Sequence, residues 1–299
     1  TYSRARGLCQ KIGDVPQIVP ALFGMWRFYI GRGDCTITRD LGRQLLDLGK
    51  SGDDPSAIVL GHYGLGFALF CYGDLKGARA QLEDGDKLYN TSMRDNLSFR
   101  LGQDPGVACL SYCALALWVL GYPDQAKRTT LKAVKLADGI SHQYSQVYAF
   151  SLACQVLQHR GEVDELLTMS ESAIGIAQEQ GFSVWIASPS IFRGWARSRQ
   201  GSAREGAHEV NAAIEAIVKA GMEMRRPYYL GLAAECLTEA GQFAEATSTL
   251  EEALAIVAAT GERWSEAELL RLRGEIETRD DVAAAEASFQ AALELARRQ

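Results

Sequence analysis

Apolar stretches of helical length recur along the chain, and each ends at a glycine that is followed by a second helix-like stretch. Successive turn glycines lie 40 residues apart, except for one interval of 48, and Asp280 takes the same place 39 residues after the last. The turn glycines are Gly33, Gly73, Gly121, Gly161, Gly201 and Gly241. No alternation of apolar and polar residues indicates strands. The pattern therefore predicts a repeat of about seven helical hairpins.

The turn residues also give the expected bounds of the helices. First helices are expected at about 16–31, 55–72, 105–120, 142–159, 182–200, 224–240 and 263–278. Their partner helices are expected at about 36–50, 74–89, 124–138, 163–180, 202–220, 242–259 and 281–298. In the third hairpin, Asp104 is the predicted N-cap and Pro105 the first helical residue, where a missing amide hydrogen costs nothing.

Mostly small residues stand at fixed distances from these turns, at positions where two antiparallel helices can approach closely. Seven residues before the turn the set is Gly66, Ala114, Cys154, Gly194 and Ala234. Five after it the set is Ala78, Ala126, Leu166, Gly206, Ala246 and Ala285, and twelve after it Gly85, Ala133, Ala173, Ala213, Ala253 and Ala292. This spacing resembles the tetratricopeptide repeat (TPR), in units longer than usual. The resemblance implies an all-α fold: a right-handed α-solenoid of TPR-like hairpins, about seven repeats of 40 residues, in one domain over residues 1–299.

The wording of three segments carries a further resemblance. They read GQDPGVACLSYCALALWVLGYPDQA (102–126), RPYYLGLAAECLTEAGQ (226–242) and TGERWSEAELLRLRGEI (260–276). Together they resemble the C-terminal TPR region of large bacterial proteins that join an adenylate or guanylate cyclase domain, or another effector, to an AAA-type ATPase. This resemblance implies a regulatory or ligand-sensing arm and carries over no catalytic residue. Because the chain also opens as if in mid-helix, we expect it to be a fragment of a larger multidomain protein.

Charge and composition narrow the classes of partner. The net charge is −6, which argues against a surface that tracks phosphates, so no nucleic-acid binding is expected of this segment. No uninterrupted apolar run approaches the roughly 20 residues that span a bilayer, and the N-terminus lacks a signal pattern. The seven cysteines are an odd number without close pairing, which favours reduced thiols packed in a core. We therefore expect a cytoplasmic protein with no membrane partner.

Candidate chemistry is sparse. Cys109 and Cys113 share a helix face, yet no second pair of cysteines or histidines accompanies them, so packing is favoured over zinc. The four histidines are scattered, and Gly49-Lys50-Ser51 lacks the earlier glycine of a phosphate loop. The sequence indicates no catalytic residue, no metal site and no cofactor.

Ligands of TPR solenoids are expected on the first helices, at a fixed phase from the turn. Positions six, ten and thirteen residues before the turn mix aromatic with isolated polar side chains, as in an apolar pocket with a few orienting groups. The candidate contacts are Arg27, Tyr63, Phe67, Tyr148, Gln155, Trp195, Tyr228 and Glu235. Packing between hairpins is the competing interpretation of each aromatic, so Arg27, Gln155 and Glu235 are the better candidates.

The 48-residue interval places eight extra residues before the third hairpin, in a loop over residues 90–104. Insertions in a regular array map to loops that often lie near the binding face. Phe99 and Arg100 in this loop are therefore candidate contacts as well, and either the groove or the loop can be the binding site.

The leading hypothesis is a non-catalytic regulatory solenoid that binds a protein segment, a peptide or a small-molecule effector and controls a linked ATPase or cyclase. The alternative is the inducer-sensing arm of an ATP-dependent transcription activator, which a C-terminal helix-turn-helix would favour. A stand-alone enzyme is a third hypothesis. Uncapped solenoid ends expose apolar faces, so association of two copies through the 281–298 helix is also expected.

Overall fold

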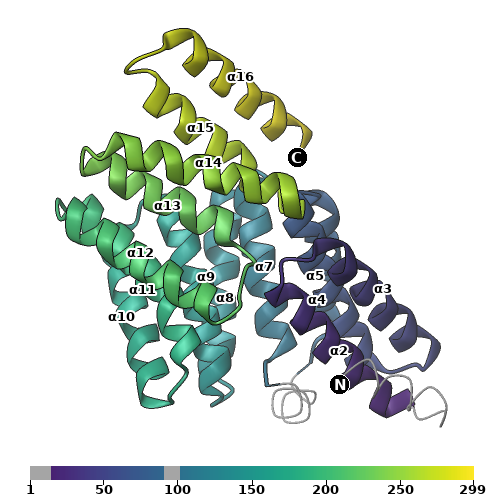
Figure 1. The fold of residues 1–299 in the computed structure, drawn as a ribbon. Helices are drawn as coiled ribbons and strands as arrows, with labels where there is room; N and C mark the ends of the chain where they lie inside the picture. The colour runs from purple at the N-terminus through teal and green to yellow at the C-terminus, as the bar shows by residue number, and fades with distance from the viewer. Residues whose placement is uncertain (1–14, 91–101) are drawn as a thin grey trace. The chain divides into compact units, whose positions relative to one another are not determined.

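The computed structural model describes residues 15–90 and 102–299, and in this part of the chain every regular element is an α-helix. Figure 1 shows the helices following one another as antiparallel hairpins. The first seven are α2 (Val15–Gly31), α3 (Cys35–Ser51), α4 (Pro55–Tyr72), α5 (Leu75–Leu88), α7 (Pro105–Val119), α8 (Pro123–Asp138) and α9 (Gln143–Arg160). The others are α10 (Val163–Glu179), α11 (Ser183–Arg199), α12 (Ala203–Lys219), α13 (Arg226–Glu239), α14 (Phe243–Thr260), α15 (Glu266–Glu277) and α16 (Val282–Arg298).

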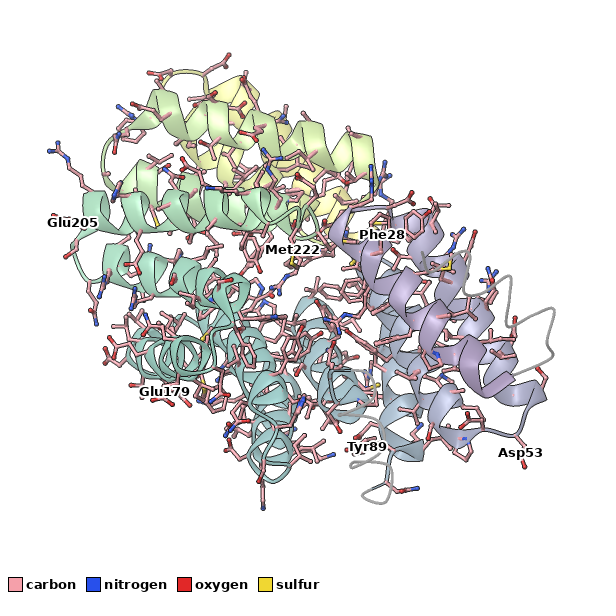
Figure 2. All side chains as sticks on the ribbon, turned by 60° about the horizontal axis from the view of Figure 1, so that its bottom comes forward. Phe28, Asp53, Tyr89, Glu179, Glu205 and Met222 are labelled. Carbon is pink, nitrogen blue, oxygen red and sulfur yellow. The ribbon has the colours of Figure 1, made fainter. Side chains whose placement is uncertain are left out.

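The predicted helix bounds are confirmed to within three residues at every end. The largest difference is the start of α15, expected at 263 and found at Glu266. In Figure 2, α12 runs between the labels Glu205 and Met222. The all-α solenoid of TPR-like hairpins predicted from the 40-residue period is thus the observed fold class.

The chain divides into two compact units. Unit 1 comprises Thr1–Phe70 and Asp74–Val156, and unit 2 comprises Cys71–Gly73 and Leu157–Gln299. Within unit 2 the hairpins α11–α12, α13–α14 and α15–α16 follow in order, and the first helices contact one another, α11 with α13 and α13 with α15. This is the nearest-neighbour stacking of a repeat protein.

Local signals in the sequence explain where the helices begin and end. Asp104 caps α7 as predicted: its Oδ1 accepts the amide of Val107 at 2.9 Å, and Pro105 is the first helical residue. The phenol of Tyr89 donates to the other carboxylate oxygen of Asp104 at 2.7 Å. At the hairpin turns the chain needs a left-handed residue, and Gly201, with φ +97°, shows why glycine recurs there.

The small residues that set the repeat are buried at helix crossings, as predicted. At Gly206 on α12 an added Cβ would lie 2.5 Å from the carbonyl oxygen of Gly194 on α11, so the two backbones touch. In unit 1 an added Cβ at Gly66 would lie 2.7 Å from Cγ of Leu82. Larger side chains at these positions would force the hairpins apart.

Although the sequence contains no uninterrupted apolar run of about 20 residues, helix α4 is long and apolar enough to cross a membrane by length and composition. Its window is 72% buried inside the fold, as in a core helix of a soluble protein. Cys109 and Cys113 on α7 are also buried, and burial raises the pKa of Cys113 to about 12. Both thiols therefore pack as neutral core groups.

Candidate functional site

In unit 1, Tyr63 lies at the centre of a buried aromatic cluster. Its ring centroid lies 5.0 Å from that of Trp26 and 6.4 Å from that of Phe67. Its hydroxyl lies 3.0 Å from the hydroxyl of Tyr148 and accepts a hydrogen bond from Nε2 of Gln103 at 3.3 Å. Burial raises the pKa of Tyr63 well above its usual range, so the phenol stays neutral. The Tyr63 hydroxyl is therefore hydrogen-bonded, whereas the buried indole nitrogen of Trp26 has no partner among the described residues. The ring contacts join the first helices to one another.

The other unit 1 candidates differ in exposure. Gln155 is fully buried, and Phe67 and Tyr148 are nearly so. Arg27 is exposed and donates from Nη2 to the hydroxyl of Tyr144 at 3.0 Å, with its guanidinium 5.7 Å from the centre of that ring. Of these four candidates, Arg27 alone offers its side chain to solvent. Their assignment as ligand contacts stays a prediction.

Phe99 and Arg100 lie outside the described residues, as does most of the loop proposed over residues 90–104. Their assignment also stays a prediction.

Unit 2 contains a cavity of about 530 Å³, within the size range of ligand pockets. Its walls come from the end of α9 and the turn that follows, and from the first helices α11, α13 and α15. The lining residues are Gln158, His159, Arg160, Gly161, Val163, Trp195, Arg199, Ala234, Glu235, Thr238, Glu239, Arg271, Leu272, Glu275 and Ile276. Two predicted contacts, Trp195 and Glu235, therefore lie together in one pocket.

Trp195 and Glu235 are joined across two successive repeats. The indole Nε1 of Trp195 on α11 donates to Oε2 of Glu235 on α13 at 2.9 Å. Burial raises the pKa of Glu235 to about 7; the bond from Trp195 opposes this rise, and the nearby charge of Glu268 adds to it. Near neutral pH the protonated and ionised forms of this carboxyl group are therefore similarly populated.

Tyr228, thirteen residues before the same turn, has a structural position instead. Its side chain is 3% exposed, and its hydroxyl donates to Oε1 of Gln158 at 2.8 Å. Its ring centroid lies 4.8 Å from that of Trp264 and 5.6 Å from that of His159. Tyr228 thus packs behind the pocket wall, and its assignment as a ligand contact stays a prediction.

Ion pairs hold the charged groups of the pocket in place. Arg160 pairs with Glu162 at 2.7 Å, and Arg199 pairs with Glu239. Partly exposed pairs of this kind contribute at most about 1 kcal/mol each, but they fix where the charges lie.

The third arginine of the pocket, Arg271, is shared by two acids on its own helix. Nη2 of Arg271 lies 2.6 Å from Glu268, and the same guanidinium also pairs with Glu275. His159 carries no compensating charge, because burial and the nearby Arg225 lower its pKa to about 3. The pocket is therefore polar and slightly acidic when Glu235 is ionised.

A fourth column, two residues before the turn, also lines the pocket and was not among the predicted contacts. His159, Arg199 and Glu239 occupy it at intervals of 40 and all line the pocket. Their signal was present in the sequence as a charged column at the ends of the first helices. In the last repeat this column falls on Thr278, and the pocket is lined there by Arg271 and Glu275, nine and five residues before Asp280.

The donor groups of the described residues were compared with the requirements of a metal site. No group of three or more histidine, cysteine, aspartate or glutamate side chains in the described ranges is placed to hold a metal ion. The cavity has apolar and charged walls.

Comparison with known proteins defines the class as a TPR-like helical repeat. The model of a tetratricopeptide repeat family matches residues 107–130. No curated protein sequence matches the chain significantly.

Solved structures resemble the fold over most of the chain. A Rap protein complexed with Competence and Sporulation Factor has a TM-score of 0.70 at 10% identity, covering 94% of this chain and 76% of that one. The Rap conjugation gene regulator of plasmid pLS20, in complex with the Phr* peptide, has a TM-score of 0.53 at 10% identity, covering 94% and 95%. The human IFIT1 dimer with m7Gppp-AAAA has a TM-score of 0.61 at 14% identity, covering 98% of this chain and 64% of that one. At these identities the likeness shows the fold alone.

Proposed function

We propose that this chain is a non-catalytic regulatory repeat that binds a peptide or a segment of another protein in the pocket of unit 2. The observation that carries the proposal is the 530 Å³ cavity between successive first helices, lined by Trp195, Glu235 and paired charges. Repeat proteins present their binding surfaces across neighbouring repeats in this way. A mixture of apolar walls and fixed polar groups favours a specific ligand over a general hydrophobic one.

The relatives support a peptide more than a nucleic acid. The pLS20 regulator is described in complex with a peptide, and its fold resembles this chain over nearly the whole length of both. IFIT1 is described with a capped RNA, but this chain has a net charge of −6 and each arginine of its pocket is paired with a glutamate. Few cationic groups are left to neutralise phosphates.

The experiment that tests binding uses a selection from phage-displayed dodecapeptides on the whole 299-residue chain, followed by fluorescence polarisation. Thr238 lines the pocket, so Thr238→Trp fills it with an indole ring. Thr247→Trp is the matched control, because Thr247 is exposed on α14 and bonds back to its own helix as Thr238 does. We expect Thr238→Trp to weaken the selected peptides by about tenfold or more and Thr247→Trp to leave them unchanged. Equal binding by both variants, or the absence of any peptide ligand, contradicts the proposal.

We propose further that binding controls an adjoining cyclase or AAA-type ATPase in a cytoplasmic bacterial protein, as the sequence resemblance implies. The test is the open reading frame that contains this segment. An N-terminal cyclase or ATPase domain supports the proposal, whereas a C-terminal helix-turn-helix supports the arm of a transcription activator. If such an enzyme domain is present, its turnover should change when the selected peptide is added, and Thr238→Trp should remove that response.

A further inference from the structure

Acidic groups outnumber arginines around the unit 2 pocket once Glu162 and Glu268, which pair with lining arginines but do not line the cavity, are counted. The arginines that line it each have a glutamate partner, and Arg271 is shared by two, Glu268 and Glu275. Glu235 forms no ion pair with any described residue; its Oε2 accepts the indole of Trp195, and its Oε1 accepts no described donor. The charges of Arg199 and Arg271 favour the ionised form of Glu235 from a distance, but both guanidinium groups are paired with other glutamates. A partly buried carboxylate without a direct ion pair is costly, so this position favours a cation from outside the chain.

We infer that this pocket takes a lysine or arginine side chain of the bound segment, with Glu235 as its counter-ion. The inference rests on the proposed function, since it names the chemistry of the peptide bound there. Leu272, Ile276 and Val163 line the same cavity and provide an apolar surface for the aliphatic stem, while Glu235 meets the charged end. A bare metal ion fits less well, because the described residues around Glu235 form no cluster of metal ligands.

The groups that face Glu235 set how its affinity for a cation depends on pH. On α11 there is Arg199, on α15 Arg271 and Glu268, and on α9 the neutral His159. Because Glu235 titrates near pH 7, a basic peptide must displace its proton below that pH. The affinity should therefore rise by about tenfold per pH unit up to pH 7 and level off above it.

The probe is an array of N-acetylated hexapeptide amides in which one position at a time is fixed to one residue type, screened with the whole chain at pH 8. The strongest binder is then synthesised with its basic residue intact and with citrulline, the neutral analogue of arginine. The variants are Glu235→Gln, which keeps an acceptor for Trp195, and the control Glu205→Gln. Glu205 is exposed near the start of α12 (Figure 2) and does not line the pocket. Its substitution by glutamine therefore removes the same charge at a site outside the pocket.

We expect lysine or arginine to dominate one position of the array. Glu235→Gln should weaken the basic peptide by about tenfold or more, change the citrulline peptide by less than about twofold, and Glu205→Gln should change neither. Binding that shows no basic preference, or an equal loss for both peptides in Glu235→Gln, overturns the inference and leaves the proposed function standing. If no peptide binds at all, the proposed function fails, and the inference fails with it.

Discussion

The close crossing of α11 and α12 leads to a stability prediction with an internal control. A Cβ at Gly206 would lie 2.5 Å from the carbonyl oxygen of Gly194 and 2.9 Å from the backbone nitrogen of Ser198. Both atoms belong to backbone, so no side chain can rotate away and the hairpin itself must open. Gly206→Ala should therefore destabilise unit 2 even though alanine favours helix.

The magnitude follows from two opposing effects. Overpacking of a tight contact costs about 3 kcal/mol at the upper end of its usual range, and exchanging glycine for alanine within a helix returns at most about 1 kcal/mol. The expected net loss for Gly206→Ala is about 2 kcal/mol. Gly175 on α10 is the control, because an added Cβ there meets nothing within 4 Å. Gly175→Ala should gain about 0.5–1 kcal/mol.

The assay is urea unfolding followed by circular dichroism, with amide hydrogen exchange of α11 and α12 as a local readout. Exchange is needed because a repeat array need not unfold in one step. The expected result is a lower urea midpoint and faster exchange in Gly206→Ala, and a higher midpoint in Gly175→Ala. A gain of stability in both variants would show instead that the two helix backbones are not in contact.

Three further predictions concern single side chains. Between about pH 4.5 and 7 the folded chain holds a proton on Glu235 that the unfolded chain has lost, so the free energy of unfolding falls as the pH rises through this range. In thermal unfolding, Glu235→Gln should therefore match the wild type at pH 4 and be more stable than the wild type at pH 8. Asp104→Ala removes the cap of α7 and should cost about 1–2 kcal/mol by urea unfolding, with Asp104→Asn costing less because an acceptor remains. Tyr228→Phe leaves Oε1 of Gln158 without its buried donor and should cost about 1–3 kcal/mol, whereas an unchanged urea midpoint would show that the bond is replaced.

The repeat was predictable from the sequence because its signals are local. A glycine such as Gly201 ends a helix in a conformation that other residues avoid, and Gly206 and Gly194 are small because two backbones meet there. Each constraint acts within one hairpin, so it recurs at a constant spacing. The start of α15 was the least accurate bound, because a turn at residues 264–265 separates Gly261 from the first helical residue, Glu266.

The candidate site was only partly predictable. The column that contains Trp195 and Glu235 was found, but the same spacing includes Gln155, which is fully buried. The position of a residue in its repeat determines on which face of the helix the residue lies. Its burial depends instead on the size of the side chains that neighbouring repeats place against that face. For the same reason the raised pKa of Glu235 could not be predicted: it arises from burial and from Glu268 in the following repeat.

The most direct test of the central claim, that unit 2 binds a peptide in its pocket, is the indole N–H signal of Trp195 in a proton–nitrogen correlation spectrum. The chain has five tryptophans, so Trp195→Phe assigns this signal by its loss. Because the indole donates to Glu235 within the pocket lining, a peptide bound there must change its surroundings. Adding a selected dodecapeptide should shift the Trp195 signal in step with binding. A peptide that saturates the chain while this signal stays in place would contradict the account.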